Sequence, residues 1–250
     1  MFSRLIGRAA VAACFCLPVN AATVSSFTND LTFNALCTDG SNPQACEAAV
    51  GEIRSGDGGP SGDFEIGLNV PVASNTFNYF ETGDVAWAEA PGVGFTFAHD
   101  GANGLTLSVG GTRVAGDLDA VGGAVRDMSA VDTLFIRTRS ESATETAGLT
   151  DLRLATGAGT VSLPDNVATA GGYRNAAYLR VTDVDFSAAW TLTGTTTFAW
   201  DDTLPKGSRL GHTFKLAEIS AVPLPSAFWM MLSAVFGLMG FRALRRRRRG

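Results

Sequence analysis

Short segments in which apolar and polar residues alternate recur through the middle of the chain. Leu105, Leu107 and Val109 stand at every second position, so a strand would place all three side chains on one face, toward a core. Residues 93–97 alternate in the same way, and turn-forming residues at 99–104 separate the two segments. The pattern predicts a β-hairpin over 93–109.

The composition also favours strands. The chain has 29 glycines and 25 threonines; glycine weakens helices, and β-branched threonine fits a pleated surface. One short helix is expected near 43–50, and a turn around 118–128. No long linker divides residues 22–220, which are predicted to form a single all-β domain, a β-sandwich or jelly roll. Its predicted strands are 63–70, 85–88, 93–97, 105–109, 133–138, 149–155, 160–163, 178–182, 190–200 and 213–219.

Residues 1–21 have the layout of a secretory signal peptide. Arg4 and Arg8 form a positive start, residues 9–17 are an apolar core, and small residues precede the junction between Ala21 and Ala22. This core is too short to span a bilayer, which needs roughly 20 residues. The alternative is a buried first helix, but nothing amphipathic follows that would dock it. We expect the Sec-type export machinery to translocate the chain, with cleavage after Ala21.

Cysteine usage agrees with export. Cys14 and Cys16 lie in the segment to be removed, which leaves Cys37 and Cys46 in the mature chain. In an oxidising compartment two remaining cysteines most simply pair with each other, and turn formers between them allow their ends to meet. The alternative is two free thiols. We predict a structural disulfide.

Residues 221–250 combine a proline-containing segment, an apolar segment and a basic end. The uncharged stretch reaches 18 residues when it is counted from Leu224, about the minimum for a spanning helix. Prolines lead into this helix, which is predicted over 226–241. The arginines of the cluster 242–249 would stay on the cytoplasmic side of the inner membrane: Arg242, Arg245, Arg246, Arg247, Arg248 and Arg249. The alternative is a core helix with a solvated basic tail.

This tail resembles the PEP-CTERM class of sorting signals. Val222, Pro223, Leu224 and Pro225 are similar to the motif of its VPLPA-CTERM variant, with Ser226 where that family has alanine. The resemblance covers the tail only. It implies recognition by an exosortase-type membrane transpeptidase, which would cleave near the motif and release or re-anchor the mature chain. The protein would be held in the inner membrane before processing and lie at the cell surface or outside the cell afterwards.

Charge is distributed unevenly along the chain. All 24 acidic residues lie between positions 22 and 225, against eleven basic residues, so this part has a net charge of −13. An acidic surface of this kind repels phosphate backbones, which excludes nucleic acid as a partner.

Patterns for catalysis and metal binding are scarce. His99 and His212 are expected to be isolated polar loop residues rather than a functional pair. The sequence has no Gly-x-Ser-x-Gly elbow, no His-Glu-x-x-His helix and no P-loop, so no catalytic, cofactor-binding or metal site is predicted. Paired aspartates are candidate calcium ligands, with solvated turn residues as the alternative: Asp57 with Asp63, Asp183 with Asp185, and Asp201 with Asp202.

Six aromatic residues have two interpretations. They can form a hydrophobic core, which is the commoner role at alternate strand positions, or a face on which sugar rings stack. The six are Trp87, Trp190, Trp200, Phe95, Phe97 and Phe198.

Two classes of function remain. The first is an exported, surface-sorted, non-enzymatic protein whose sandwich is structural or binds exopolysaccharide or a matrix protein. The second is a secreted carbohydrate-active enzyme on a jelly roll, whose carboxylate separation cannot be read from a sequence. A third interpretation, an uncleaved single-pass membrane protein, differs in processing rather than in chemistry. The short chain and the scarce histidines favour the first class.

Overall fold

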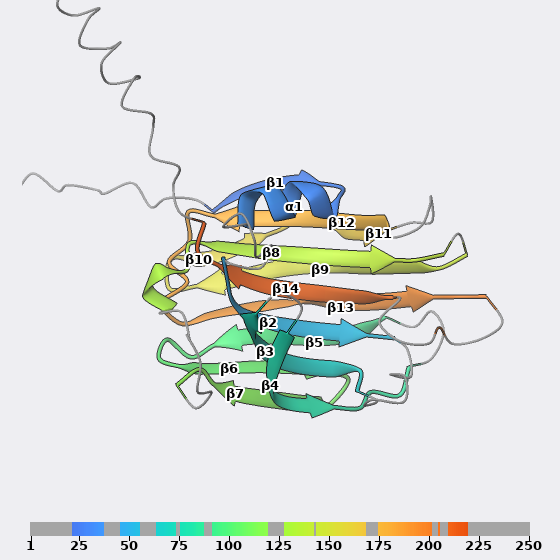
Figure 1. The fold of residues 1–250 in the computed structure, drawn as a ribbon, viewed down its shortest axis with the longest axis horizontal. Coiled ribbons are helices and arrows are strands. Elements are labelled where there is room, and N and C mark those ends of the chain that lie inside the picture. Colours follow the sequence, from blue (N-terminus) through green and yellow to red (C-terminus); the bar gives the residue numbers. More distant parts are fainter. Residues whose placement is uncertain are drawn as a thin grey trace, which may run out of the picture. The chain divides into compact units, whose positions relative to one another are not determined.

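The computed structural model describes residues 22–37, 46–55, 64–73, 76–87, 92–119, 128–142, 144–168, 175–201, 205 and 210–219. The chain up to Glu218 clusters as one compact unit. Its strands pair antiparallel in two sheets that stack on each other (Figure 1). This arrangement confirms the predicted all-β class and is consistent with a β-sandwich.

Sheet A has the strand order β1-β12-β8-β14-β2-β3-β4, and sheet B has the order β10-β9-β13-β5-β6-β7, with β11 also paired to β9. The strands of sheet A are β1 (Thr23–Phe27), β2 (Glu47–Arg54), β3 (Ile66–Ala73), β4 (Thr76–Gly83), β8 (Thr133–Ser140), β12 (Asn175–Thr182) and β14 (Gly211–Ala217). Those of sheet B are β5 (Val93–His99), β6 (Gly104–Val109), β7 (Thr112–Asp117), β9 (Thr146–Thr156), β10 (Gly159–Ser162), β11 (Asn166–Ala168) and β13 (Trp190–Ala199).

The two sheets share one hydrophobic core. Leu105, Leu107 and Val109 are at most 1% exposed, as their alternation predicted. Phe214 of sheet A stacks on Phe95 and Phe97 of sheet B, with ring centroids 5.1 and 5.4 Å apart. Aromatic pairs of this kind add about 0.5–1.5 kcal/mol beyond the area that they bury, so these rings hold the sheets together.

The predicted hairpin over 93–109 is present, because β5 pairs with β6. The next connection, from β6 to β7, is the two-residue turn Gly110-Gly111, whose φ angles are +56° and +96°. Two successive positive φ angles match the twist of a type I′ hairpin turn, and glycine adopts them without steric cost. The strand β7 was not among the predicted elements.

Helix placement is the main correction to the predicted elements. Of the segment 43–50, predicted as helix, residues 47–50 belong to β2, while the helix of the fold is α1 (Asp30–Cys37). Asn29 caps α1, since its side-chain oxygen accepts a hydrogen bond from the Thr32 amide at 2.8 Å. Residues 85–87, predicted as strand, have no regular structure. The turn expected near 118 is present, and a 3₁₀-helix follows at Met128–Ala130.

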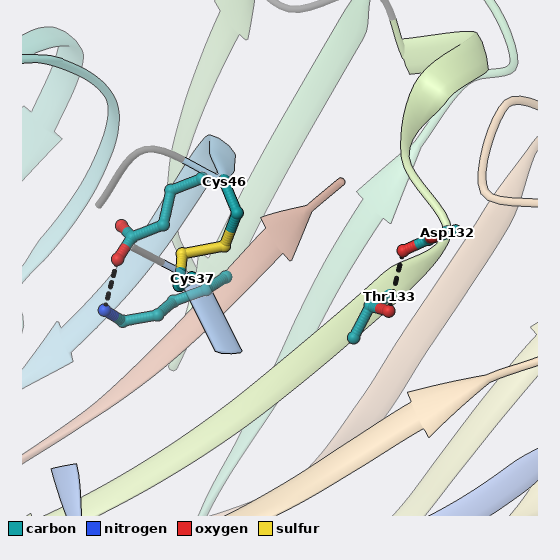
Figure 2. Close-up of a disulfide and its surroundings, with 6 residues drawn as sticks. Cys37, Cys46, Asp132 and Thr133 are labelled. Carbon is teal, nitrogen blue, oxygen red and sulfur yellow. Dashed lines mark hydrogen bonds and ion pairs between the residues drawn. A yellow bond between two sulfur atoms is a disulfide. The ribbon is translucent and has the colours of Figure 1, made fainter. Parts of the chain in front are cut away.

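Helix α1 packs on the outer face of sheet A and is fastened there by a disulfide. Cys37 ends the helix and is bonded to Cys46, which precedes β2, with 4.9 Å between the Cα atoms (Figure 2). This bond confirms the predicted pairing. The Cys46 carbonyl also accepts a hydrogen bond from the Glu218 amide at 2.9 Å. The disulfide therefore lies beside the point where the chain leaves the compact unit.

Replacing Cys46 with serine is expected to lower the free energy of unfolding by about 2–3 kcal/mol, because the bond closes only a short loop and the shared core remains. Urea unfolding of the oxidised wild type and of Cys46→Ser measures the difference. Wild type treated with a reductant should lose a similar amount. Alkylation of both thiols in the unreduced, denatured wild type would contradict the bond itself.

Candidate ligand-binding site

Two hollows lie at one end of the sandwich, which we call the His99 end. Trp190 at the start of β13 pairs with both His99 and Thr156, so the ends of β5 and β9 lie in one row. Strand β14 ends on the same side as β12. Leu216 near the end of β14 pairs with Leu134, and Leu134 also pairs with Val181 near the end of β12. The first hollow extends over strand residues of sheet B, whereas connecting segments at this end contribute to the second.

The first hollow, the Arg113 hollow, has a volume of about 490 Å³ and lies over β5, β6 and β7. Three small side chains line it in one cross-strand row: Ala98, Thr106 and Ala115. Charged groups of both signs also line it, namely Arg113, Asp117 and Asp100. The hollow thus offers a shallow floor together with hydrogen-bond donors and acceptors, a combination that suits a hydroxyl-bearing ligand.

The second hollow, the Asp183 hollow, has a volume of about 470 Å³. Its apolar lining includes Leu154, Val161 and Val184, and its carboxylates are Asp183 and Asp185. The first residue of the predicted mature chain, at position 22, lines the same hollow. It too therefore combines an apolar surface with carboxylate acceptors.

His99 links the walls of the two hollows. Its ring is 3% exposed, with Nδ1 3.2 Å from the Ala188 carbonyl oxygen and Nε2 3.0 Å from that of Ala102. Both partners are acceptors, and a neutral imidazole has one N–H donor, so only the protonated ring can donate to both. The side chain connects the β5–β6 turn to the segment that leads into β13.

Turn hydrogen bonds set the charge of two of the lining carboxylates. Asp100 accepts hydrogen bonds from the amides of Ala102 at 2.7 Å and Gly104 at 3.1 Å, and these bonds hold its pKa below the usual value. The Ser187 hydroxyl and amide act in the same way on Asp185 and lower its pKa. Both carboxylates are therefore ionised acceptors at neutral pH.

The aspartate pairs proposed for calcium have different outcomes. Asp183 and Asp185 both line the Asp183 hollow, but Asp185 directs one oxygen to Ser187. Calcium takes six to eight oxygen ligands, and the described residues contain no group of three or more acidic, histidine or cysteine side chains placed to hold a metal. Asp57, Asp63 and Asp202 lie outside the described residues.

The prediction for the two histidines is corrected. Both were expected in polar loops, yet His99 ends β5 and His212 lies in β14, and they are 3% and 1% exposed. His212 stacks on Phe198 with centroids 4.9 Å apart and shares a hydrogen bond with Thr138 Oγ1 at 3.0 Å. The histidines share neither a contact nor a hydrogen bond, so the described chain does not bring them together as a pair.

Burial gives His212 a predictable acid dependence. Loss of solvation lowers the pKa of His212 to about 3, whereas an unfolded histidine binds a proton near pH 6.5. As the pH falls from 6.5 toward 3, the unfolded state therefore gains protons that the folded state does not. From pH 7 to pH 4 this group should remove on the order of 3 kcal/mol from the free energy of unfolding. Urea unfolding at both pH values tests this. Between pH 7 and pH 4, the free energy of unfolding of His212→Leu should fall by less than that of wild type. An equal loss in wild type and variant would contradict the assignment.

The aromatic residues support the core interpretation. Trp190, Phe95, Phe97 and Phe198 are at most 3% exposed, and Trp87 and Trp200 pack against the same core while partly buried. A sugar-stacking face made of these six residues is therefore wrong. The polar and charged side chains of this end lie in its two hollows instead.

The sorting residues fall outside the part that the structure describes. This holds for Val222, Pro223, Leu224 and Pro225, for the predicted helix 226–241, for the arginine cluster 242–249 and for Ala21; Ala22 is described. Among the described residues, no helix is long and apolar enough to cross a membrane.

Sequence reasoning missed a charged cluster beneath α1. Arg137 donates from Nε and Nη2 to the two oxygens of Asp30 at 2.9 and 2.8 Å, and the Tyr178 hydroxyl donates to Asp30 at 2.5 Å. Partial burial raises the pKa of Asp30, but the hydrogen bonds and charge of Arg137 outweigh that effect and leave the pKa below its usual value. The three residues come from three separate elements, so no spacing in the sequence signals them. The cluster docks α1 and is structural.

Searches with protein-family models and with curated protein sequences find no match to this chain.

Proposed function

We propose that this is an exported, surface-sorted, non-enzymatic protein whose β-sandwich is a structural or binding module of the cell envelope or extracellular matrix. Its tail would hold it in the inner membrane until an exosortase-type enzyme processes the sorting motif. Export, the sorting enzyme as a partner and processing of the tail are parts of this proposal.

The Cys37–Cys46 disulfide is the single observation that carries the proposal. Disulfides form and persist in oxidising compartments and are rare in the cytosol. Both cysteines are buried, at 2% and 6% exposed, and the bond fastens α1 to the sheet that it covers. A bond built into the packing in this way supports folding outside the cytoplasm.

The start of the first strand and the end of the compact unit support the predicted processing sites. Strand β1 begins at Thr23, one residue after the predicted new amino terminus. It pairs with β12 through Thr182, so the mature chain would begin directly in a sheet. The unit ends at Glu218, three residues before the predicted sorting signal. Cleavage at either site would therefore leave the sandwich intact.

The strand order supports a jelly-roll-like topology. From β8 onward the main strands alternate between the sheets, with β8, β12 and β14 in sheet A and β9 and β13 in sheet B. Crossing between sheets at successive connections is typical of jelly rolls, and their end loops often carry binding sites.

Asp100 and Asp185 are suited to accepting hydrogen bonds from a ligand rather than to acting as the general acid of glycoside hydrolysis. Hydrolysis needs one carboxylic acid that stays protonated, with a raised pKa, beside an ionised partner. Asp100 and Asp185, one in each hollow, both have lowered pKa values because of their turn hydrogen bonds. Ionised carboxylates of this kind accept hydrogen bonds from hydroxyl groups without donating a proton.

Amino-terminal sequencing of the protein isolated from producing cells tests export. The mature chain should begin at Ala22 or within a residue or two of it, because the signal-peptide cleavage site precedes that residue. A matched sample made without the export pathway should keep Met1. A folded, envelope-associated protein that starts at Met1 would contradict the proposal.

A further inference from the structure

Among the basic side chains that the structure describes, two have no hydrogen-bond or ion-pair partner and no aromatic ring beneath them. The structure describes seven Lys and Arg residues. Four form ion pairs, which are Arg54 with Glu52, Arg137 with Asp30, Arg139 with Glu141 and Lys215 with Glu47, and Arg180 lies over the Phe135 ring. Arg113 and Arg153 are both exposed and have no hydrogen-bond or ion-pair partner among the described residues. In a segment with a net charge of −13, these two arginines are the described cations that remain available to an external anion.

The two unpaired arginines stand in the same cross-strand row of sheet B. Following the pairing from β10 to β7, this row reads Ser162, Arg153, Thr193, Thr96, Ser108 and Arg113. Four strand spacings separate Arg153 from Arg113, which places their backbones about 19 Å apart. Hydroxyl side chains occupy every position between them.

This row lies on the outer face of the sheet. The residues that flank it along each strand, such as Phe97, Leu107 and Leu192, are fully buried in the core, so the row itself must point away from the core. The adjacent outward row consists of small residues alone: Thr160, Ala155, Thr191, Ala98, Thr106 and Ala115. The face therefore consists mainly of short side chains, many of which carry hydroxyls. Arg153 and Arg113 stand toward its two edges, and the Arg113 hollow lies within it.

We propose that an acidic polysaccharide binds across the strands of sheet B, along the row from Arg153 to Arg113. Its carboxylates would pair with the two guanidinium groups, and its ring hydroxyls would exchange hydrogen bonds with Thr193, Thr96 and Ser108. Strand-to-strand spacing of about 4.8 Å gives one hydroxyl side chain for roughly each sugar ring of an extended chain. The inference rests on the proposed function, which brings this face into contact with the extracellular matrix.

The spacing of the arginines distinguishes this ligand from other polyanions. Nucleic acid carries one charge per about 1.7 Å of helix, and an acidic domain would be repelled by so dense a charge. An anionic lipid surface would be repelled for the same reason. Two cations about 19 Å apart with hydroxyl side chains between them suit a polymer that is less densely charged than nucleic acid and carries ring hydroxyls together with its carboxylates.

Equilibrium binding of the full chain in detergent to polygalacturonate oligosaccharides tests this site, with dextran as the neutral sugar. Wild type should bind polygalacturonate more tightly than dextran, and added salt should weaken that binding. Arg113→Gln and Arg153→Gln should each weaken it about tenfold, since each loses a charge-assisted hydrogen bond. Thr193→Tyr should also weaken it, because the larger side chain blocks the row without a change of charge.

Arg180→Gln is the matched control. It removes the same charge from sheet A and should leave binding within about twofold of wild type. Equal binding of dextran and polygalacturonate, or equal losses in all three arginine variants, would overturn the site. So would a preference for phosphatidylglycerol vesicles or duplex DNA over polygalacturonate. A chain that starts at Ala22 and is sorted but binds no polygalacturonate overturns this inference alone, whereas a chain that binds but keeps Met1 overturns the proposed export alone.

Discussion

In cells that carry the sorting enzyme, the double variant Pro223→Ala/Pro225→Ala is expected to keep the arginine tail, whereas the wild-type chain loses the residues after about position 225. Each proline fixes its own φ and biases the preceding residue toward extended geometry. Both prolines also lack an amide donor, so under the proposed sorting the motif would not be drawn into a sheet and would stay available to a membrane enzyme. Alanine removes both properties. Mass spectrometry of the carboxyl-terminal peptide shows whether the tail is present. It should be absent from the wild-type protein and present on all of the double variant.

Pro164→Ala is the matched control for this variant. Pro164 is exposed between β10 and β11 and is not part of the motif, so its replacement should leave processing as in wild type. If wild type and the double variant both keep the tail, the motif is a spacer and the protein is a plain membrane-anchored sandwich. If both proteins lose the tail, the enzyme does not depend on the two prolines to recognise its substrate.

Asp30→Asn is expected to lower the free energy of unfolding by about 1–3 kcal/mol, which is less than the cost of breaking a fully buried ion pair because solvent screens the partly exposed Asp30. The Arg137 side chain is 15% exposed and that of Asp30 is 39% exposed. Removing Asp30 therefore leaves a buried cation, whereas Arg137→Met leaves a carboxylate that can reach water. The first variant should be the less stable of the two. Urea unfolding of both variants and wild type at pH 7 measures the order.

Asp165→Asn serves as control, since Asp165 is exposed and should change stability by no more than about 0.5 kcal/mol. The pH dependence gives a second readout. Because Arg137 lowers the pKa of Asp30, this group stabilises the fold above its ordinary pKa of 3.8, and that contribution is lost as the pH falls through the lower native pKa. Asp30→Asn should lack this acid-dependent loss. Equal stability of Asp30→Asn and Asp165→Asn would contradict the docking role of the cluster.

Buried regular strands were the predictable part of the fold. The hairpin of β5 and β6 carries apolar residues at strict alternation with a turn between them, and both its pairing and its inward face were predicted. Strand β4 was missed because it is largely exposed, so its sequence has no buried face to mark it. The helix was misplaced because α1 depends on a cap at Asn29 and on docking to sheet A, and an eight-residue helix has little intrinsic stability.

The candidate site was predictable only in its residue types. Asp183 and Asp185 were singled out as a local pair, and they do line one hollow. The row from Arg153 to Arg113 was not predicted, because it depends on pairing between strands far apart in the sequence. The histidines were placed in loops on the basis of neighbouring turn residues. Their burial follows instead from the direction that each strand position gives to its side chain.

The intact mass of the protein isolated from the outside of producing cells, without reduction, tests export, sorting and disulfide formation in one measurement. We expect a chain that begins at Ala22, ends near Pro225 and is two hydrogens lighter than its reduced form, because Cys37 and Cys46 are bonded. A chain that retains Met1 and the arginine cluster, with both thiols free, would contradict export, sorting and the oxidising compartment together.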